Sequence, residues 1–275
     1  MRLTLLQLLL PIRQSISSFV VRECLLNNWQ DARMLKLTGF AANEFLQGYV
    51  TCNTDRLSEL ACTPFAACSL QGRVIANGWA LQLGDAIGLV IHHTTVQTFR
   101  DYLAPYLRFS KCTLNGSEDF VYVTRSANAT TAELISGWHL VRDISTAPVE
   151  TAQVPDVSPL INEQLIERRM VLIQQACSGR HLPQMLALQE HGAVDFDKGC
   201  YLGQEVVARA SFRGAVKRNL AAFAIDEPTA VELGKTYEKA DGKGEVVMLG
   251  EKQGLWVTRI SVSYTHLTLP TICSV

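Results

Sequence analysis

The stretch KGCYLGQEVVARASFRGAVKR, Lys198–Arg218, places a single cysteine between two glycines and follows it with a short helical pattern. Gly199 and Gly203 flank Cys200, and glycines this dense indicate a turn whose backbone takes positive φ or approaches a ligand closely. The segment GQEVVARA that follows has helix-forming character. The pattern therefore predicts that Cys200 lies just before or at a helix N-terminus.

The surroundings expected for Cys200 favour a thiolate. A helix N-terminus favours an anion, and Lys198 adds positive charge nearby in the sequence. A thiolate attacks electrophiles, binds soft metals or becomes oxidised. We expect the other polar motif residues to shape the environment of this thiol: Tyr201, Gln204 and Glu205.

Other interpretations of the motif stay open. Free cysteine is among the most buried residue types, so packing explains Cys200 as well as reactivity does. A catalytic thiol needs a paired base, and nothing in the sequence places His191 beside it. The basic residues downstream form either a solvated face or a site for a phosphate or carboxylate: Arg209, Arg213, Lys217 and Arg218.

The composition is that of a globular chain with room for two domains. Of its 275 residues 48% are hydrophobic, and the formal net charge is −1, which excludes a global basic field for nucleic acid. No run of about 20 apolar residues predicts a membrane span, and the leucine-rich start lacks a signal-peptide cleavage site. The eight cysteines show no C-x-x-C pair or zinc-site spacing. We expect a cytoplasmic protein with reduced thiols and no metal site.

Strand and helix patterns interleave over the first 220 residues and predict an α+β fold. Thr38 is the expected N-cap of a helix that Gly48 ends. Strands separated by turns at Gln71-Gly72 and Gly84-Asp85 are expected within 64–91. The remaining expected elements are a strand at 119–124, a loop at 143–160, helices at 94–109, 130–140 and 161–179, and short strands at 220–225, 244–249 and 254–260.

The stretch VSYTHLTLPT, Val262–Thr271, resembles the translation of a common transposon-based sequencing adapter. We therefore expect residues 262–275 to be a non-native tail, which removes His266 and Cys273 from the functional candidates. Residues 1–25 are an uncertain N-terminal extension. Between them we expect an α+β body over 26–219 and the start of an all-β module, truncated, over 220–261.

The stretch Lys198–Arg218 closely resembles the signature of the YgfZ family of folate-binding, tRNA-modifying proteins, relatives of iron–sulfur assembly factors. The resemblance continues in PQMLALQEHGAVDFD, LTGFAANEFLQGYVTCNTDRL and ACTPFAACSLQGRVIANGWAL, and covers about Trp29 to Ile260. It implies an α+β fold: a body like the aminomethyltransferase T-protein, with a ferredoxin-like part around a central folate cavity, and a C-terminal β-barrel.

The same resemblance implies a folate-binding accessory protein that supports iron–sulfur enzymes, such as radical tRNA methylthiotransferases, and thereby tRNA modification. Its cofactor is tetrahydrofolate or a derivative, its reactive thiol is Cys200, and direct contact with tRNA is not required. Arg209 and Arg213 meet an anionic partner or the folate glutamate tail. Trp29 stacks on the pterin ring, with packing in the core as the alternative.

Two further hypotheses belong to other classes. Aminomethyltransferases carry acidic residues in the segment that matches GRVIANGW, where this chain has Ala76 and Asn77. Neither residue is a carboxylate base, so a folate-dependent one-carbon transferase is the alternative rather than the expectation, and we lean against an enzyme. A stable metal protein needs several cysteines that converge on Cys200, which no spacing demands.

Overall fold

The computed structural model describes residues 26–259, except for 117–119, 129, 136, 143–153, 215, 226–230 and 240–241. The expected extension over 1–25, the expected tail over 262–275 and most of the expected loop over 143–160 lie outside the described residues. None of the helices described here is long and apolar enough to cross a membrane.

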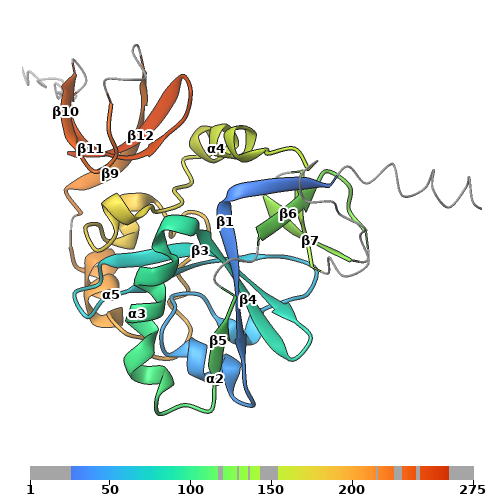
Figure 1. Ribbon diagram of the computed structural model, residues 1–275. Coiled ribbons are helices and arrows are strands. Elements are labelled where there is room, and N and C mark those ends of the chain that lie inside the picture. The colour runs from blue at the N-terminus through green and yellow to red at the C-terminus, as the bar shows by residue number, and fades with distance from the viewer. Residues whose placement is uncertain are drawn as a thin grey trace, which may run out of the picture.

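An eight-stranded sheet forms the centre of the body (Figure 1). Its strand order is β2-β3-β4-β1-β6-β8-β7, β5 pairs with β1, and every one of these pairings is antiparallel. The strands are β1 Asn27–Thr38, β2 Thr63–Cys68, β3 Val74–Leu83, β4 Ala86–His92, β5 Thr113–Asn115, β6 Phe120–Thr124, β7 Thr131–Ile135 and β8 Trp138–Val141.

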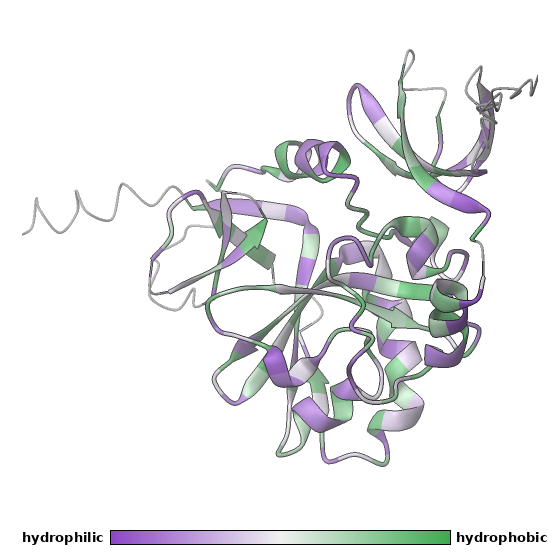
Figure 2. Cartoon of the chain, turned by 180° about the vertical axis from the view of Figure 1, so that it is seen from behind, coloured by the Kyte–Doolittle hydropathy of each residue, from purple (hydrophilic) through white to green (hydrophobic). Residues whose placement is uncertain are grey.

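Side chains on the two faces of this sheet belong to two separate apolar clusters. Helices α2 (Ala42–Gln47) and α3 (Val96–Leu107) cover one face, where Phe65 packs on Phe99. The other face packs against helix α4 (Ser158–Glu167) and the segments that follow it. Figure 2 shows that α4 carries both hydrophobic and hydrophilic residues, as a helix with one buried side does.

A second, four-stranded sheet curls beside the body, as Figure 1 shows. Arg180 donates a hydrogen bond from the body to the Glu245 carboxylate of this sheet, and the Glu251 backbone N–H donates to Glu163 of α4. The expected all-β strands are confirmed, although one of the four, β10, was not predicted. The strands, in the order β10-β11-β12-β9, are Thr236–Lys239, Gly242–Leu249, Gln253–Arg259 and Arg218–Ala224.

Several local predictions are confirmed. The turns after β2 and β3 contain Gly72 and Gly84 at φ of +70° and +57°. The helix expected at 94–109 is α3, which contains Pro105. The predicted N-cap at Thr38 is wrong. Thr38 is the last residue of β1 and pairs with Thr113 of β5, so long-range strand pairing extends the strand past the position where a cap was expected.

The helix predicted at 130–140 is wrong, because this segment forms the hairpin β7–β8. Gly137 turns the chain at φ +74°, and β8 pairs with β6 inside the sheet. Trp138 and Leu140 are buried there, and the Arg125 guanidinium lies 3.7 Å from the centre of the Trp138 ring. Pairing with β6 and the burial that comes with it stabilise this hairpin. Because β6 is a separate strand of the sheet, helix propensity within 130–140 does not reflect this stabilisation.

The helix predicted at 161–179 has different bounds, since α4 runs from Ser158 to Glu167. Asp156 accepts hydrogen bonds from the backbone and hydroxyl of Ser158 at the start of the helix. Beyond its end, the buried Asn77 side chain fixes an extended segment: Nδ2 donates to the Val171 carbonyl at 2.6 Å, and Oδ1 accepts the Ile173 N–H at 2.8 Å.

We expect Asn77→Asp to lower the free energy of unfolding by about 2–3 kcal/mol, because a buried carboxylate cannot donate to the Val171 carbonyl. The unfolding midpoint in urea measures this change. Asn115→Asp, at an exposed position, is the control and should change stability by less than about 0.5 kcal/mol. Equal midpoints for the two variants would contradict the role given to Asn77.

Candidate functional site

Lys198 fastens the motif segment to the loop that follows α2. Its side chain is buried, and its Nζ donates three hydrogen bonds, to the carbonyls of Gln47 at 2.8 Å, Val50 at 2.6 Å and Cys52 at 2.8 Å. Burial lowers the pKa of Lys198 to about 8, so the ammonium is still protonated at pH 7. The predicted positive charge is therefore used by buried carbonyls and is not directed at Cys200.

Thr51 adds a second set of contacts between the same two segments. Its hydroxyl donates to the Ala193 carbonyl, and its own carbonyl accepts the Asp195 N–H at 2.9 Å. The Leu202 N–H donates to the Gly48 carbonyl at 3.0 Å. These bonds hold the motif segment on both sides of Cys200. No sequence pattern pointed to Thr51 beyond its place in one of the stretches that resemble the family.

The two glycines of the motif have different roles. Gly203 lies at φ +84° and is the N-cap of helix α5 (Gln204–Phe212), and a Cβ there would lie 2.3 Å from the Ser69 carbonyl oxygen. Gly203 thus has the positive φ expected of a motif glycine, and it also allows close contact with the chain's own backbone. Gly199 is not at positive φ, and a Cβ added to it would meet no atom within 4 Å. The expected positive φ is therefore found at Gly203 and not at Gly199.

Cys200 is an exposed, free cysteine. The other described cysteines are buried or half-buried, and burial raises the thiol pKa to about 12 in Cys52, Cys62 and Cys68 and to about 11 in Cys177. Cys112 is also buried. Of the cysteines in the described ranges, only Cys200 is exposed to solvent. The interpretation of Cys200 as a packing residue is therefore wrong.

Cys200 lies before a helix, which is the first of the two positions that the sequence predicted for it. Helix α5 begins at Gln204, so the cysteine precedes the first helical residue by a full turn, beyond the range over which a helix dipole acts strongly. His191 does not supply a base, because its Nε2 lies 3.1 Å from the Arg169 carbonyl oxygen. Within the described part of the chain, no hydrogen bond or ion pair engages the Cys200 side chain.

The polar residues around Cys200 divide into buried and exposed ones. Tyr201 is buried, with its ring centre 5.1 Å from the Lys198 ammonium, and burial raises its pKa. Gln204 is half-buried at the start of α5. Glu205 is exposed and forms an ion pair with Arg209 one turn later. The buried side chains support the loop, and the exposed pair lies on its outer surface.

The predicted basic cluster does not form one site. Arg209 is paired with Glu205 on the surface, and Arg213 is an exposed residue at the C-cap of α5. Lys217 is exposed as well. Arg218 belongs to β9 and lines a cavity of about 350 Å³ in the second sheet, together with Lys243, Glu245 and Arg259.

An exposed aromatic pair accompanies the motif and was not predicted. Phe196 lies four residues before Cys200 in the chain, and Phe212 is the last residue of α5. Their ring centres are 5.1 Å apart, and 72% of the Phe212 surface is exposed. Exposed aromatic residues in contact with one another are a feature of surfaces that bind other proteins.

Trp29 lies in the core, which was the alternative to its predicted contact with folate. It has no exposed surface, and its ring packs on Trp79 of β3 with centroids 5.6 Å apart at an interplanar angle of 64°. No ring face is therefore open to a pterin in this structure. Trp79, whose role the sequence did not reveal, completes this pair.

The chain is similar to known proteins in sequence and in fold. No family model matches the chain. Proteins of Shigella boydii serotype 4 and Escherichia coli K12, each named tRNA-modifying protein YgfZ, are 28% identical over 246 residues, which cover 78% of this chain and 76% of each relative. The crystal structure of glycine cleavage system aminomethyltransferase T from Bartonella henselae matches with a TM-score of 0.62 and 11% identity, over 86% of this chain and 78% of that one.

These similarities confirm two predictions. The relatives bear the name of the family that the cysteine motif resembles. The structural match confirms the aminomethyltransferase-like α+β fold, and at 11% identity it concerns the fold alone.

The unlike roles of the two motif glycines give a paired test. We expect Gly203→Ala to lower the free energy of unfolding by at least about 1–2 kcal/mol, the cost of placing a side chain at this φ, with the close contact to Ser69 adding to it. Gly199→Ala should stay within about 0.5 kcal/mol of the parent. Thermal or urea unfolding measures both, and similar losses in both variants would contradict the geometry described for the motif.

Proposed function

We propose that this protein is a cytoplasmic, folate-binding accessory protein that supports iron–sulfur enzymes and thereby tRNA methylthiolation. The name of the curated relatives supports the connection with tRNA modification. The single structural observation that carries the proposal is the exposure of Cys200 on a segment fixed by the buried Lys198. The chain keeps one thiol accessible while it buries or half-buries the other described ones.

The surroundings of Cys200 suit transient chemistry better than general-base catalysis. No histidine or carboxylate among the described residues is paired with its thiol, as an activated nucleophile of a hydrolase requires. A solvent-open thiol can instead hold an iron ion briefly or react with a one-carbon or oxidised species. These are the tasks that the proposal assigns to Cys200.

The proposed partners are iron–sulfur enzymes such as radical tRNA methylthiotransferases. The exposed pair of Phe196 and Phe212 supports contact with a protein near the cysteine. The exposed Arg213 offers a contact for an acidic partner or for a folate glutamate tail. Direct contact with tRNA is not required, since the net charge of the chain is −1.

Tetrahydrofolate or a derivative is the proposed cofactor. Two buried polar atoms of β1, Nε1 of Trp29 and Oδ1 of Asn28, have no hydrogen-bond partner among the described residues. Unpaired buried polar atoms are uncommon, and a pterin carries both donors and acceptors. Because successive residues of a strand point to opposite faces of the sheet, the two atoms belong to different faces, and a folate would meet one of them only.

The alternative function, a folate-dependent aminomethyl transferase, draws support from the shared fold. The position of Asn77 argues against it. Both polar atoms of this side chain are used by the Val171 carbonyl and the Ile173 N–H, so the residue is structural and supplies no carboxylate base. We therefore favour the accessory role.

The direct test is complementation in a bacterium that lacks its own relative, with methylthiolated tRNA bases quantified by mass spectrometry. We expect the chain to restore the modification and Cys200→Ser to lose at least about 90% of this effect, because serine neither binds soft metals nor forms a thiolate. Cys62→Ser, at a half-buried thiol, is the matched control and should restore the modification.

Equal protein levels in the cell must accompany this comparison, so that a loss of function is not a loss of folding. If Cys200→Ser restores the modification as fully as the parent chain, the thiol has no role and the proposal is wrong. The same holds if the parent chain restores nothing.

A further inference from the structure

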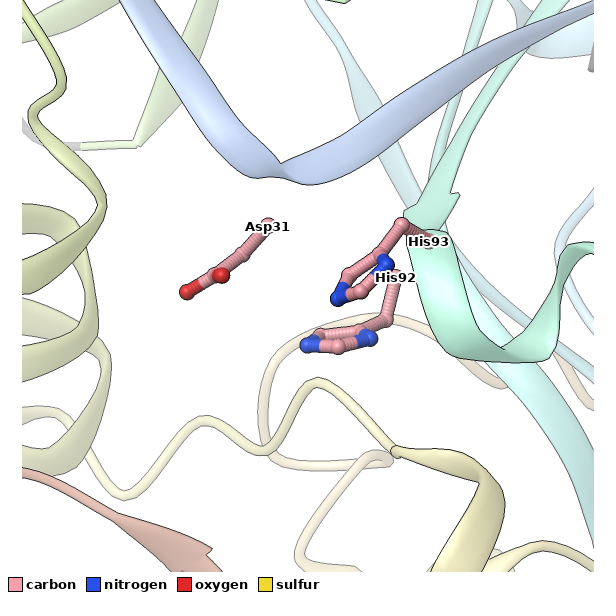
Figure 3. Close-up of side chains that lie close together, drawn as sticks. All are labelled: Asp31, His92 and His93. Atoms are coloured by element: carbon pink, nitrogen blue, oxygen red, sulfur yellow. The ribbon is translucent and has the colours of Figure 1, made fainter. Parts of the chain in front are cut away.

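We propose that Asp31, His92 and His93 form a binding site for a divalent first-row transition-metal ion of the Zn²⁺ type. One potential ligand atom from each residue lies within 4.8 Å of the other two. Figure 3 shows the two imidazole rings side by side, both extending toward the side on which Asp31 lies. This site is distinct from the cysteine motif and does not depend on the function proposed for it.

The sheet itself brings these three residues together. Strands β1 and β4 are antiparallel, and Ala32 of β1 lies opposite His92 at the end of β4. The pairing of β1 with β6 shifts register between Trp29 and Arg33, and Asp31 lies within this irregularity. Such bulges bend a strand and redirect a side chain, and they are frequent next to functional sites.

The Asp31 carboxylate is held in place by α4. Asn162 donates from Nδ2 to Oδ2 of Asp31 at 2.7 Å, and the Asp31 backbone N–H donates to the Ser158 hydroxyl at 3.2 Å. Oδ1 takes part in no hydrogen bond with the residues that the structure describes. One oxygen is thus oriented by a neighbouring amide while the other is left for a ligand, as in many metal sites.

His92 contributes the buried imidazole of the site. It is the last residue of β4, and its side chain is shielded from solvent. Its Nδ1 lies 2.9 Å from the Thr94 hydroxyl oxygen, which also accepts the Gln175 N–H at 3.1 Å. Nδ1 also accepts the Thr94 backbone N–H at 3.2 Å, which places the proton of the neutral ring on Nε2. An ion that binds Nε2 therefore requires this proton to move to Nδ1, where the Thr94 hydroxyl accepts it and the contact with the Thr94 N–H is given up.

His93 completes the site from the exposed side. Its ring centre lies 4.6 Å from that of His92, with 33° between the ring planes. Two atoms bound to one Zn²⁺ ion at about 2.1 Å lie at most about 4.2 Å apart, so the cluster must contract slightly. Because His93 is exposed, rotation of its side chain achieves this without a change in the core.

Two imidazole nitrogens and one carboxylate oxygen select the class of metal. Mg²⁺ and Ca²⁺ prefer oxygen ligands, whereas Zn²⁺, Co²⁺ and Fe²⁺ accept this mixed set. Three protein ligands leave at least one position open for water or an anionic ligand. Arg33 opposes the binding of a cation, but its guanidinium donates to the carbonyls of Gln30 and Ala32 and lies over the Phe120 ring.

No metal site was predicted from the sequence, because the prediction considered only the spacing of the cysteines. Asp31 lies in β1, His92 ends β4 and His93 begins the short 3-10 helix that follows, and no local pattern connects Asp31 with the two histidines. Their proximity follows from the β1–β4 register, which is a long-range property of the fold.

Co²⁺ and Zn²⁺ are the probes for the test, and the full chain is used with Cys200→Ser so that the exposed thiol does not compete. Co²⁺ binding is followed by its visible absorption, and Zn²⁺ displaces it in the presence of a chelator of known affinity. We expect one Co²⁺ per chain with nitrogen and oxygen ligation and without a thiolate charge-transfer band. His93→Ala and Asp31→Asn should each weaken binding at least about tenfold.

The controls are His191→Ala and Asp85→Asn, which remove a histidine and an exposed aspartate outside the cluster and should leave affinity unchanged. Thermal unfolding of the metal-free variants checks that each is folded. If His93→Ala and Asp31→Asn bind Co²⁺ as tightly as the parent, or if the parent shows a thiolate band or no uptake, the proposal is wrong.

Discussion

The contact of the Lys198 ammonium with three carbonyl oxygens is the interaction on which the cysteine motif depends. The loop after α2 directs the carbonyls of Gln47, Val50 and Cys52 toward one point, where a buried acceptor without a donor costs about 1–3 kcal/mol. One ammonium supplies all three donors. Lys198 was predicted from the sequence to favour the thiolate of Cys200. In the structure it instead stabilises the loop after α2.

This support extends from Lys198 to the helix that follows the motif. Gly203 lets the chain pass close to the Ser69 carbonyl, and Gly72 of the same β2–β3 turn lies against Val206 of α5. Gln184 also donates to the Val207 carbonyl and to the Ser211 hydroxyl. A helix held by these contacts gives the preceding turn a fixed position at the surface, and this turn carries Cys200.

Local sequence patterns predicted the elements whose partners lie nearby in the chain. The strands on both sides of Gly72 and Gly84 and the helix that contains Pro105 have clear periodicity and clear turn residues. The failures at 130–140 and 161–179 have a common cause. Pairing with β6 in one case and hydrogen bonds to Asn77 in the other come from distant residues and override local helix propensity.

The candidate site was predictable in its residues but not in their roles. The motif identified Cys200 and its neighbours, whereas the exposure of the thiol, the carbonyl partners of Lys198 and the burial of Trp29 follow from tertiary packing. The Asp31, His92 and His93 cluster was not predicted at all, since it arises from the β1–β4 register and a bulge.

The central claim is that the fold leaves Cys200 open while it shields the other described thiols, and alkylation of the native chain tests this most directly. The chain is treated with iodoacetamide without denaturant, and the modified cysteines are mapped by mass spectrometry. We predict that Cys200 is modified quickly, while the buried thiols react only after unfolding: Cys52, Cys68, Cys112 and Cys177. Protection of Cys200, or modification of these four at the same rate, would contradict the account.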